Sequence, residues 1–118
     1  MKWKGKTMYL VIKTSQEEID RQGSLFEAAR GHWRLDPNHA SQCSHAVIAL
    51  LGNKDIKAVY NIDKIYPSTL IDGRYVFSGD TDKALESKLV GKTLNSRLTA
   101  KGLENPILYV EEKELLEA

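Results

Sequence analysis

The amino-acid sequence predicts an α+β fold, namely a curved sheet or pseudo-barrel of five to six mostly antiparallel strands with flanking helices. Short apolar runs, which are typical of buried strands, are more numerous than helical stripes. Two of these runs are separated only by a short polar turn, which predicts a hairpin. The regular alternation of strands and helices that marks a doubly wound parallel sheet is missing. The chain has 118 residues, so we expect a single domain over residues 1–118.

The first expected elements are a strand and a short helix. Residues 8–12 are continuously apolar, which predicts a central strand over residues 7–13 that is covered on both faces. Ser15 and Glu18 have the spacing of a capping box, and Gly23 is suited to end the helix that they begin.

A second helix is expected over residues 25–30, because Ser24 and Glu27 repeat the capping spacing and a glycine follows. Residues 33–35 are expected to form a short strand. The Asp-Pro-Asn sequence at residues 36–38 predicts a turn that opens one helical turn.

The clearest structural prediction is a hairpin. Residues 45–51 are almost wholly apolar, and the polar sequence Gly-Asn-Lys-Asp at residues 52–55 suits a turn. Apolar side chains then occupy the even positions of residues 56–62, which places them on one face of the returning strand.

The remaining elements are less regular. Residues 63–67 are expected to continue that strand or to form a new one, and residues 74–78 to form a strand. A helix is expected over residues 83–90, capped by residues 78–81 and ended by Gly91. The stretch over 93–100 is ambiguous, and a strand over 107–110 and a short helix from Glu111 are expected to follow it.

Composition and charge exclude several classes of protein. With 42% hydrophobic and 28% charged residues, the chain is neither disordered nor a membrane protein by composition. The apolar run near the N-terminus is too short for a signal peptide or a transmembrane helix. The single cysteine fits a reducing compartment, so we expect a cytoplasmic protein with no membrane contact. The formal net charge of +1 is far below that of a dedicated duplex-DNA binder.

Candidate metal and catalytic patterns are weak. His32, His39, Cys43 and His45 lie close together in sequence, but their spacing is not that of a zinc site. Cys43 and His45 could be a thiol and its base, although side chains two apart on a strand diverge and cysteine is common in cores. Phosphate-cradling glycine loops and paired apolar-flanked carboxylates are missing. We therefore expect neither a metal ion nor a cofactor, and catalysis is the less favoured alternative.

The segment from Arg30 to Arg34 carries the strongest functional pattern. Two guanidinium groups, an imidazole and an indole surround Gly31 where a helix meets a strand. Arginine binds phosphate well, and tryptophan stacks on unpaired bases. In the alternative interpretation, Trp33 is a core residue and Arg30 is the cation at the C-terminal end of a helix.

The same segment carries a resemblance to a known family. Residues 25–35 (LFEAARGHWRL) are followed by the hairpin, by RYVFSG at residues 74–79, by LVGK at 89–92 and by GLENPILYV at 102–110. In this order the motifs resemble those of small bacterial and phage domains that are similar to the PUA-like superfamily, which includes the ASCH, EVE and YTH domains.

The resemblance implies a PUA-like pseudo-barrel that binds RNA or modified bases, in single-stranded or flipped form, without catalysis. It implies that Trp33 stacks on the base and that Arg30 and Arg34 contact phosphate. Arg74 and Asn105 recur in the motifs and complete the expected nucleic-acid-binding set. Further aromatic residues for a methyl-base cage could come from Trp3, Tyr60 and Tyr66.

Three functional hypotheses follow. The first is a non-catalytic nucleic-acid-binding module that reads an unpaired or modified nucleotide in a cleft. The alternative is a protein-interaction or regulatory accessory subunit with a vestigial cleft, in which edge strands and the acidic tail at residues 111–118 contact a protein partner. A nucleotide-processing enzyme is the third, with Lys54, Lys57, Tyr60 and Tyr66 as nearby polar groups.

Overall fold

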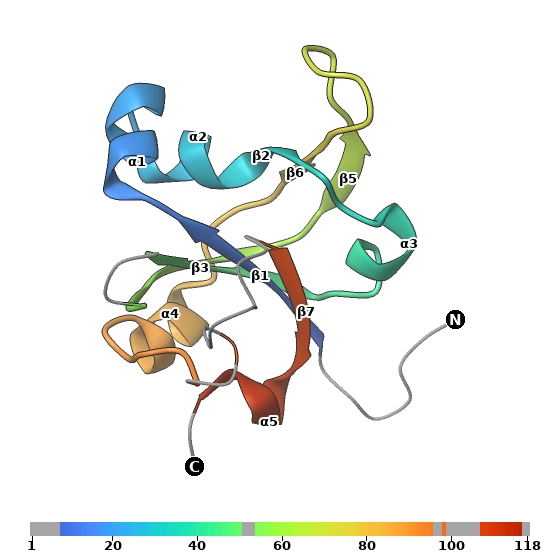
Figure 1. Ribbon diagram of the computed structural model, residues 1–118. Coiled ribbons are helices and arrows are strands. Elements are labelled where there is room, and N and C mark those ends of the chain that lie inside the picture. The colour runs from blue at the N-terminus through green and yellow to red at the C-terminus, as the bar shows by residue number, and fades with distance from the viewer. Residues whose placement is uncertain (1–7, 51–53, 96–97, 99–106, 117–118) are drawn as a thin grey trace.

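The computed structural model describes residues 8–50, 54–95, 98 and 107–116, and it confirms the α+β class. Figure 1 shows that the long strands cross the middle of the molecule, with helices on either side. The first sheet has the strand order β4-β3-β1-β7. Its members are β1 (Met8–Thr14), β3 (His45–Leu50), β4 (Ile56–Asn61) and β7 (Ile107–Glu111). The β1–β3 pairing is parallel, and the β1–β7 and β3–β4 pairings are antiparallel.

A second sheet of three antiparallel strands has the order β2-β6-β5. Its members are β2 (Gly31–Trp33), β5 (Lys64–Pro67) and β6 (Tyr75–Ser78). The described residues therefore form seven strands in two sheets, whereas the sequence predicted five to six strands in one curved sheet or pseudo-barrel. The segment at residues 63–67 is the cause, because it leaves the first sheet and pairs with β6.

The helices begin and end close to the expected positions. They are α1 (Gln16–Gln22), α2 (Leu25–Arg30), α3 (Pro37–Ala40), α4 (Lys83–Leu89) and α5 (Glu112–Leu115). As predicted, Ser15 Oγ accepts a hydrogen bond from the Glu18 N–H, and Gly23 ends α1 with a φ of 90°. None of the helices in the described part of the chain is long and apolar enough to cross a membrane.

Two local predictions were wrong. The cap of α4 is Asp82, whose carboxylate accepts a hydrogen bond from the Leu85 N–H, and not a residue of 78–81. The strand after α2 covers residues 31–33, not 33–35. It pairs with β6 where Gly31 lies opposite Val76, and a Cβ atom at Gly31 would lie 2.1 Å from Val76 Cγ1. Glycine is therefore required there by close packing between two strands.

The central strand β1 is covered on both faces, as the sequence predicted. Its residues alternate between two clusters of buried side chains, so that Leu10 and Ile12 belong to one and Tyr9 and Val11 to the other. The second sheet, α2 and α3 contribute to the first cluster. Helices α4 and α5 contribute to the second cluster, through Leu89 and Leu115.

The predicted hairpin is present, but its face assignment is wrong at one position. Ala58 and Tyr60 point into the first cluster, whereas Ile56 belongs to the second cluster together with Val59. The register of the β3–β4 pairing shifts between Ile48 and Ala49. An extra residue at such a bulge changes the face on which the next side chain lies.

Candidate functional site

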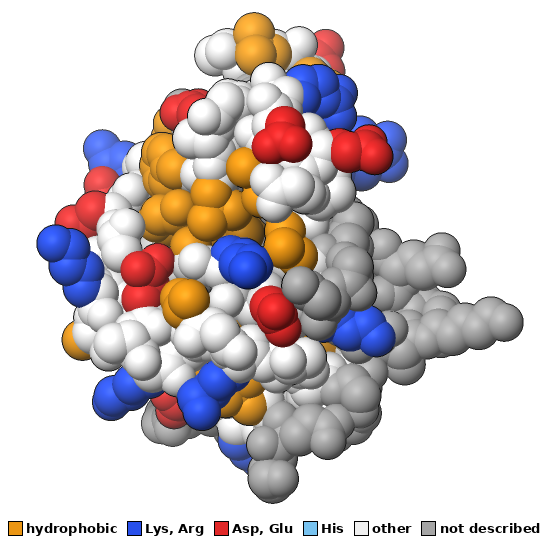
Figure 2. All heavy atoms as spheres, turned by 90° about the vertical axis from the view of Figure 1, so that its left-hand side faces the viewer, with side chains coloured by type: hydrophobic (Ala, Val, Ile, Leu, Met, Phe, Trp, Pro, Cys, Tyr) orange, Lys and Arg blue, Asp and Glu red, His pale blue; other side chains and the backbone are white. Residues whose placement is uncertain are grey.

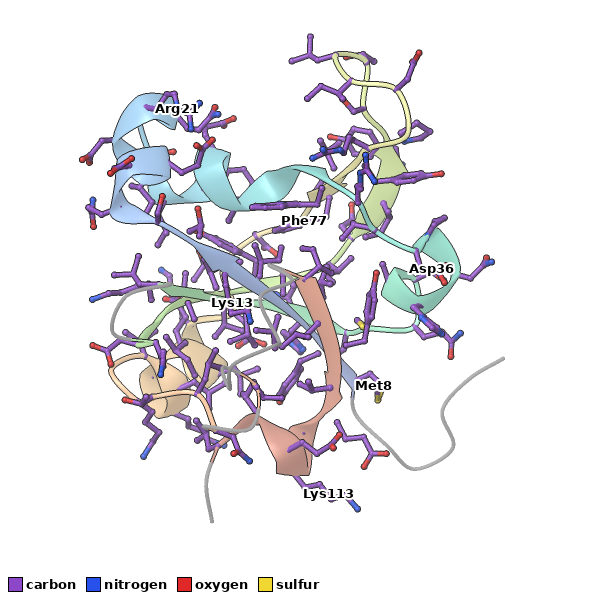
Figure 3. All side chains as sticks on the ribbon, viewed as in Figure 1. Met8, Lys13, Arg21, Asp36, Phe77 and Lys113 are labelled. Carbon is purple, nitrogen blue, oxygen red and sulfur yellow. The ribbon has the colours of Figure 1, made fainter. Side chains whose placement is uncertain are left out.

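A cleft of about 470 Å³ lies where the C-terminal end of β1 meets α1, β2 and the turn between β5 and β6. Figure 3 shows Arg21 on α1 and Lys13 on β1 beneath it. The volume is within the range of about 300–1,000 Å³ that is typical of ligand sites. The cleft is lined by Lys13, Thr14, Ser15, Glu18, Arg21, Gln22, Gly31, Trp33, Ile71 and Arg74.

Trp33 is held in a fixed orientation at this cleft. Its indole Nε1–H donates a hydrogen bond of 2.8 Å to the carbonyl oxygen of Ala29. That carbonyl belongs to the last turn of α2, where carbonyls lack partners within the helix. The indole also packs against the first core cluster and is only partly buried. Trp33 thus combines the two interpretations of the sequence, since it contacts the core and also lines a cleft.

Basic side chains predominate around the cleft. Lys13, Arg21 and Arg74 line it, and Glu18 is the only carboxylate among the lining residues that the structure describes. Arg21 forms an ion pair with Glu18. The Lys13 side chain is only 4% exposed, and its Nζ donates a hydrogen bond of 3.1 Å to the carbonyl oxygen of Leu98. Burial lowers the pKa of Lys13. Lys13 and Arg21 thus already have partners within the fold.

The turn between β5 and β6 is ordered by its own hydrogen bonds. The Ser68 N–H donates to the Arg74 carbonyl at 2.8 Å, and the Ser68 hydroxyl accepts from the N–H groups of Leu70 and Ile71, both at 3.0 Å. These bonds fix the position of Arg74 and Ile71, the two turn residues that line the cleft.

The predicted site residues are brought together only in part. Trp33 and Arg74 line the same cleft. Arg34 is exposed and does not line it. The side chain of Arg30 and the whole of Asn105 lie outside the described part of the molecule, so their predicted roles stay predictions.

Sequence reasoning missed Lys13, Thr14, Arg21 and Ile71 as cleft residues. They lie on other elements and carry no motif of their own. One signal was available: a lysine and a threonine end an otherwise apolar buried strand, and both are almost fully buried in the structure. Polar side chains that are buried at a strand end are candidates for a site.

The candidate aromatic residues for a methyl-base cage do not gather at the cleft where the structure describes them. Tyr60 is buried, and its ring packs edge-on against Phe26 at 5.0 Å between ring centroids. Tyr66 is partly exposed on β5 and does not line the cleft. Trp3 lies outside the described residues. Burial also raises the pKa of Tyr60, so that its hydroxyl stays neutral in the core.

Cys43 does not have the environment of a nucleophile. It is buried, its Sγ–H donates to the His39 carbonyl at 3.6 Å, and burial raises its pKa to about 11. The thiolate is the reactive form of cysteine, so this thiol is inert at neutral pH. Across the residues that the structure describes, no three His, Cys, Asp or Glu side chains come close enough together to hold a metal ion.

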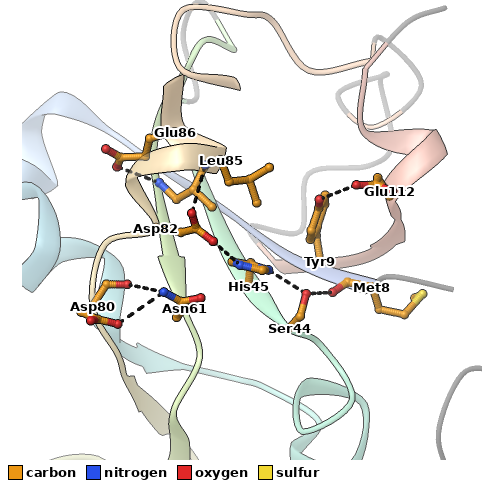
Figure 4. A network of polar contacts seen from close by, with 11 residues as sticks. Met8, Tyr9, Ser44, His45, Asn61, Asp80, Asp82, Leu85, Glu86 and Glu112 are labelled. Carbon is orange, nitrogen blue, oxygen red and sulfur yellow. Dashed lines mark hydrogen bonds and ion pairs between the residues drawn. The ribbon is translucent and has the colours of Figure 1, made fainter. Parts of the chain in front are cut away.

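A polar network on the other side of the first sheet holds α4 in place (Figure 4). The His45 ring lies 2.7 Å from Ser44 Oγ through Nδ1 and 2.8 Å from Asp82 Oδ2 through Nε2. Glu86 of α4 accepts a hydrogen bond from the Val59 N–H of β4 at 3.0 Å. The pKa of Asp82 is lowered, mainly by the hydrogen bond from the Leu85 N–H and then by the one to His45.

Residues 111–116 of the acidic tail are part of the fold. Glu112 accepts a hydrogen bond of 3.0 Å from the Tyr9 hydroxyl, and burial together with this carboxylate raises the pKa of Tyr9 to about 12. Leu115 is 1% exposed in the second core cluster. A smaller hollow of about 250 Å³ between α4 and α5 is lined by these elements and Tyr9.

Comparison with protein-family models, with curated proteins and with solved structures finds no match in any of the three.

Proposed function

We propose that the protein is a non-catalytic nucleic-acid-binding module that reads an unpaired or modified nucleotide in the cleft beside Trp33. The observation that supports it most is the position of Trp33 and Arg74. They come from separate sequence motifs, and both line the one cleft. A base would stack on the indole, and a guanidinium would contact the phosphate.

The PUA-like assignment is part of this proposal. It is supported by the order of the sequence motifs and by the α+β architecture. In this interpretation, the two sheets correspond to the two halves of a PUA-like pseudo-barrel, and the cleft lies between one end of β1 and the β2-β6-β5 sheet.

The stacking role of Trp33 can be tested by replacing it with leucine. Stacking contributes on the order of 1–3 kcal/mol per base, so Trp33→Leu should weaken binding of a short single strand by about five- to 150-fold. Binding is measured by fluorescence anisotropy of labelled RNA and DNA strands that carry plain or methylated bases. Circular dichroism and a urea titration show whether the variant is folded.

Two further variants keep this test decisive. Trp33→Phe retains a ring for both packing and stacking, so it should bind more tightly than Trp33→Leu. Lys92→Gln removes an exposed cation outside the cleft and should bind like the wild type. Equal affinity of the folded Trp33→Leu variant and the wild type would contradict the proposal.

The accessory-subunit alternative has weaker support than the sequence suggested. The outer edge of β4 is covered, because the Ile56 N–H donates to the Lys92 carbonyl and the Val59 N–H to the Glu86 carboxylate. The acidic tail contributes Leu115 to the core, so its removal would unfold the protein before it tested a partner. A pull-down with the intact chain is the experiment for this alternative.

A further inference from the structure

Thr14, the last residue of β1, lies where the first core cluster ends and the cleft begins. Side chains alternate along a strand, so Thr14 follows Leu10 and Ile12 on the face of β1 that packs into this cluster. Its backbone pairs with Leu50 of β3. The residue is only 3% exposed, and it lines the cleft together with Trp33. A buried strand of the first sheet therefore holds the Thr14 side chain at the wall of the cleft.

The Thr14 hydroxyl makes no hydrogen bond to any residue that the structure describes. Throughout this part of the chain, no side-chain nitrogen or oxygen atom is both closed off from solvent and without a partner. The Thr14 oxygen therefore borders open space, and the open space that Thr14 lines is the cleft. A largely buried hydroxyl without a partner destabilises a fold, and valine would fill the same volume without that cost. The fold alone thus gives no reason for a hydroxyl at this position.

The other polar residues of the cleft already take part in interactions within the fold. Lys13, which lies on the opposite face of β1, donates a hydrogen bond to the Leu98 carbonyl. Arg21 forms an ion pair with Glu18. Partners within the chain are likewise found for Ser15, Gln22, Trp33 and Arg74. Among the lining residues that the structure describes, Thr14 thus carries the polar group that is left for a ligand.

The surface around α1 does not carry charge of one sign. Figure 2, in which the side of the molecule that carries α1 faces the viewer, shows basic and acidic side chains over the same upper part. Helix α1 itself contains Glu17, Glu18 and Asp20 besides Arg21. Charges of both signs partly cancel at a distance, so they do not by themselves select a ligand. Selection in the cleft therefore depends on the neutral hydroxyl of Thr14, which can both donate and accept a hydrogen bond.

We propose that Thr14 is a specificity-determining residue of the cleft, and that its hydroxyl forms a hydrogen bond with an uncharged polar group on the edge of a base that stacks on Trp33. The inference rests on the proposed function, although Thr14 belongs to none of the sequence motifs that suggested that function. A site that hydrogen-bonds a polar group of its ligand rejects an analogue that lacks this group, since a buried polar atom is then left unpaired. Thr14 therefore distinguishes one plain or modified base from the others.

The test uses single strands in which one base is flanked by abasic sites, so that only this base can enter the cleft. Strands with adenine, cytosine, guanine, uracil or methylated adenine are compared by fluorescence anisotropy. The wild type should prefer at least one base by about tenfold, and Thr14→Val should bind this base about tenfold more weakly. The affinity of Thr14→Val for the other bases should not change. Thr14→Ser keeps the hydroxyl and should keep the preference.

The stability of the variants separates this role from a structural one. Without an oligonucleotide, urea unfolding should show that Thr14→Val is at least as stable as the wild type, because the lost hydroxyl has no partner in the described part of the fold. Thr81→Val is the matched control, since Thr81 is exposed and does not line the cleft. It should bind every strand like the wild type.

Three results would overturn the role of Thr14 and leave the proposed function standing. They are a wild-type base preference in the folded Thr14→Val variant, equal affinity of the wild type for all the bases, and a lower stability of Thr14→Val than of the wild type. Absence of wild-type binding to these strands and to uninterrupted single strands would overturn both proposals.

Discussion

The two faces of the first sheet use their polar side chains differently. On the α4 face, His45 pairs with Asp82, Tyr9 with Glu112, and Glu86 with a backbone N–H of β4. Each of these contacts joins two elements of the fold. On the other side, the indole of Trp33, Arg21 of α1 and the β5–β6 turn residues Ile71 and Arg74 line a volume of about 470 Å³.

The difference shows that residue types alone do not reveal a site. Ser44, His45 and Asp82 form a hydrogen-bonded chain of the kind that activates hydroxyl nucleophiles. Here Asp82 also caps α4, and Ser44 Oγ lies 3.4 Å from the Met8 carbonyl. The chain therefore connects α4 to the sheet. Trp33, which could pass for a core residue, lines the cleft.

The largest effect on stability is expected from Gly31→Ala, at a glycine of β2 that also lines the cleft. The new Cβ would lie 2.1 Å from Val76 Cγ1, and overpacking of this kind costs about 1–3 kcal/mol. Urea unfolding should show this loss, and oligonucleotide binding should weaken because β2 carries Trp33.

Val76→Ala provides the matched test of this steric explanation. It removes the clashing methyl group, so the double variant Gly31→Ala/Val76→Ala should be more stable than the sum of the single effects implies. Additive losses would mean that the contact between β2 and β6 is not the cause.

A smaller effect is expected from Arg74→Gln, which tests the cleft cations without disturbing the core. Affinity for a single strand should fall several-fold, and the slope of log affinity against log salt concentration should decrease by about 0.7 for one lost phosphate contact. Salt titrations of the variant and of Lys92→Gln measure this directly. Arg34→Gln extends the comparison, because a reduced salt slope in this variant would show that the nucleic-acid interface reaches beyond the cleft.

The smallest effect is expected on the α4 face, from Asp82→Asn. The carboxylate has a pKa below its ordinary value of 3.8 in the folded state. Its contribution to stability is therefore present above that ordinary value and is lost as the pH falls through the lowered one. Asparagine can still cap α4, so the variant should lose less stability than the wild type on acidification, and nucleotide binding should not change. An equal acid dependence of urea unfolding in both proteins would contradict this role of Asp82.

The parts of the fold that depend on neighbouring residues could be predicted from sequence. Capping serines located α1 and α2, and the polar turn located the β3–β4 hairpin. The departure of β5 into a second sheet could not be predicted, because short strands carry no mark of their partner. The bulge beside Ile56 could not be predicted from sequence either, since it depends on the register in which β4 pairs with β3.

For the candidate site, too, the residues within local motifs could be predicted and those brought in by the tertiary fold could not. Trp33 and Arg74 stand in recognisable motifs and were predicted, whereas Lys13 and Arg21 reach the cleft only because β1 and α1 fold beside β2. Ile71 was not singled out, because it reaches the cleft only through the turn between β5 and β6. Tertiary proximity, which a single sequence does not encode locally, defines the rest of the site.

The most direct test of the central claim is the intrinsic fluorescence of Trp33 in a Trp3→Phe background, where it is the only tryptophan. The protein is titrated with short single-stranded RNA and DNA that carry plain or methylated bases. We expect saturable quenching that weakens as salt is added, because a base stacks on the indole while cations contact its phosphate. Unchanged fluorescence with every oligonucleotide, in a protein shown to be folded, would contradict the nucleotide-binding cleft.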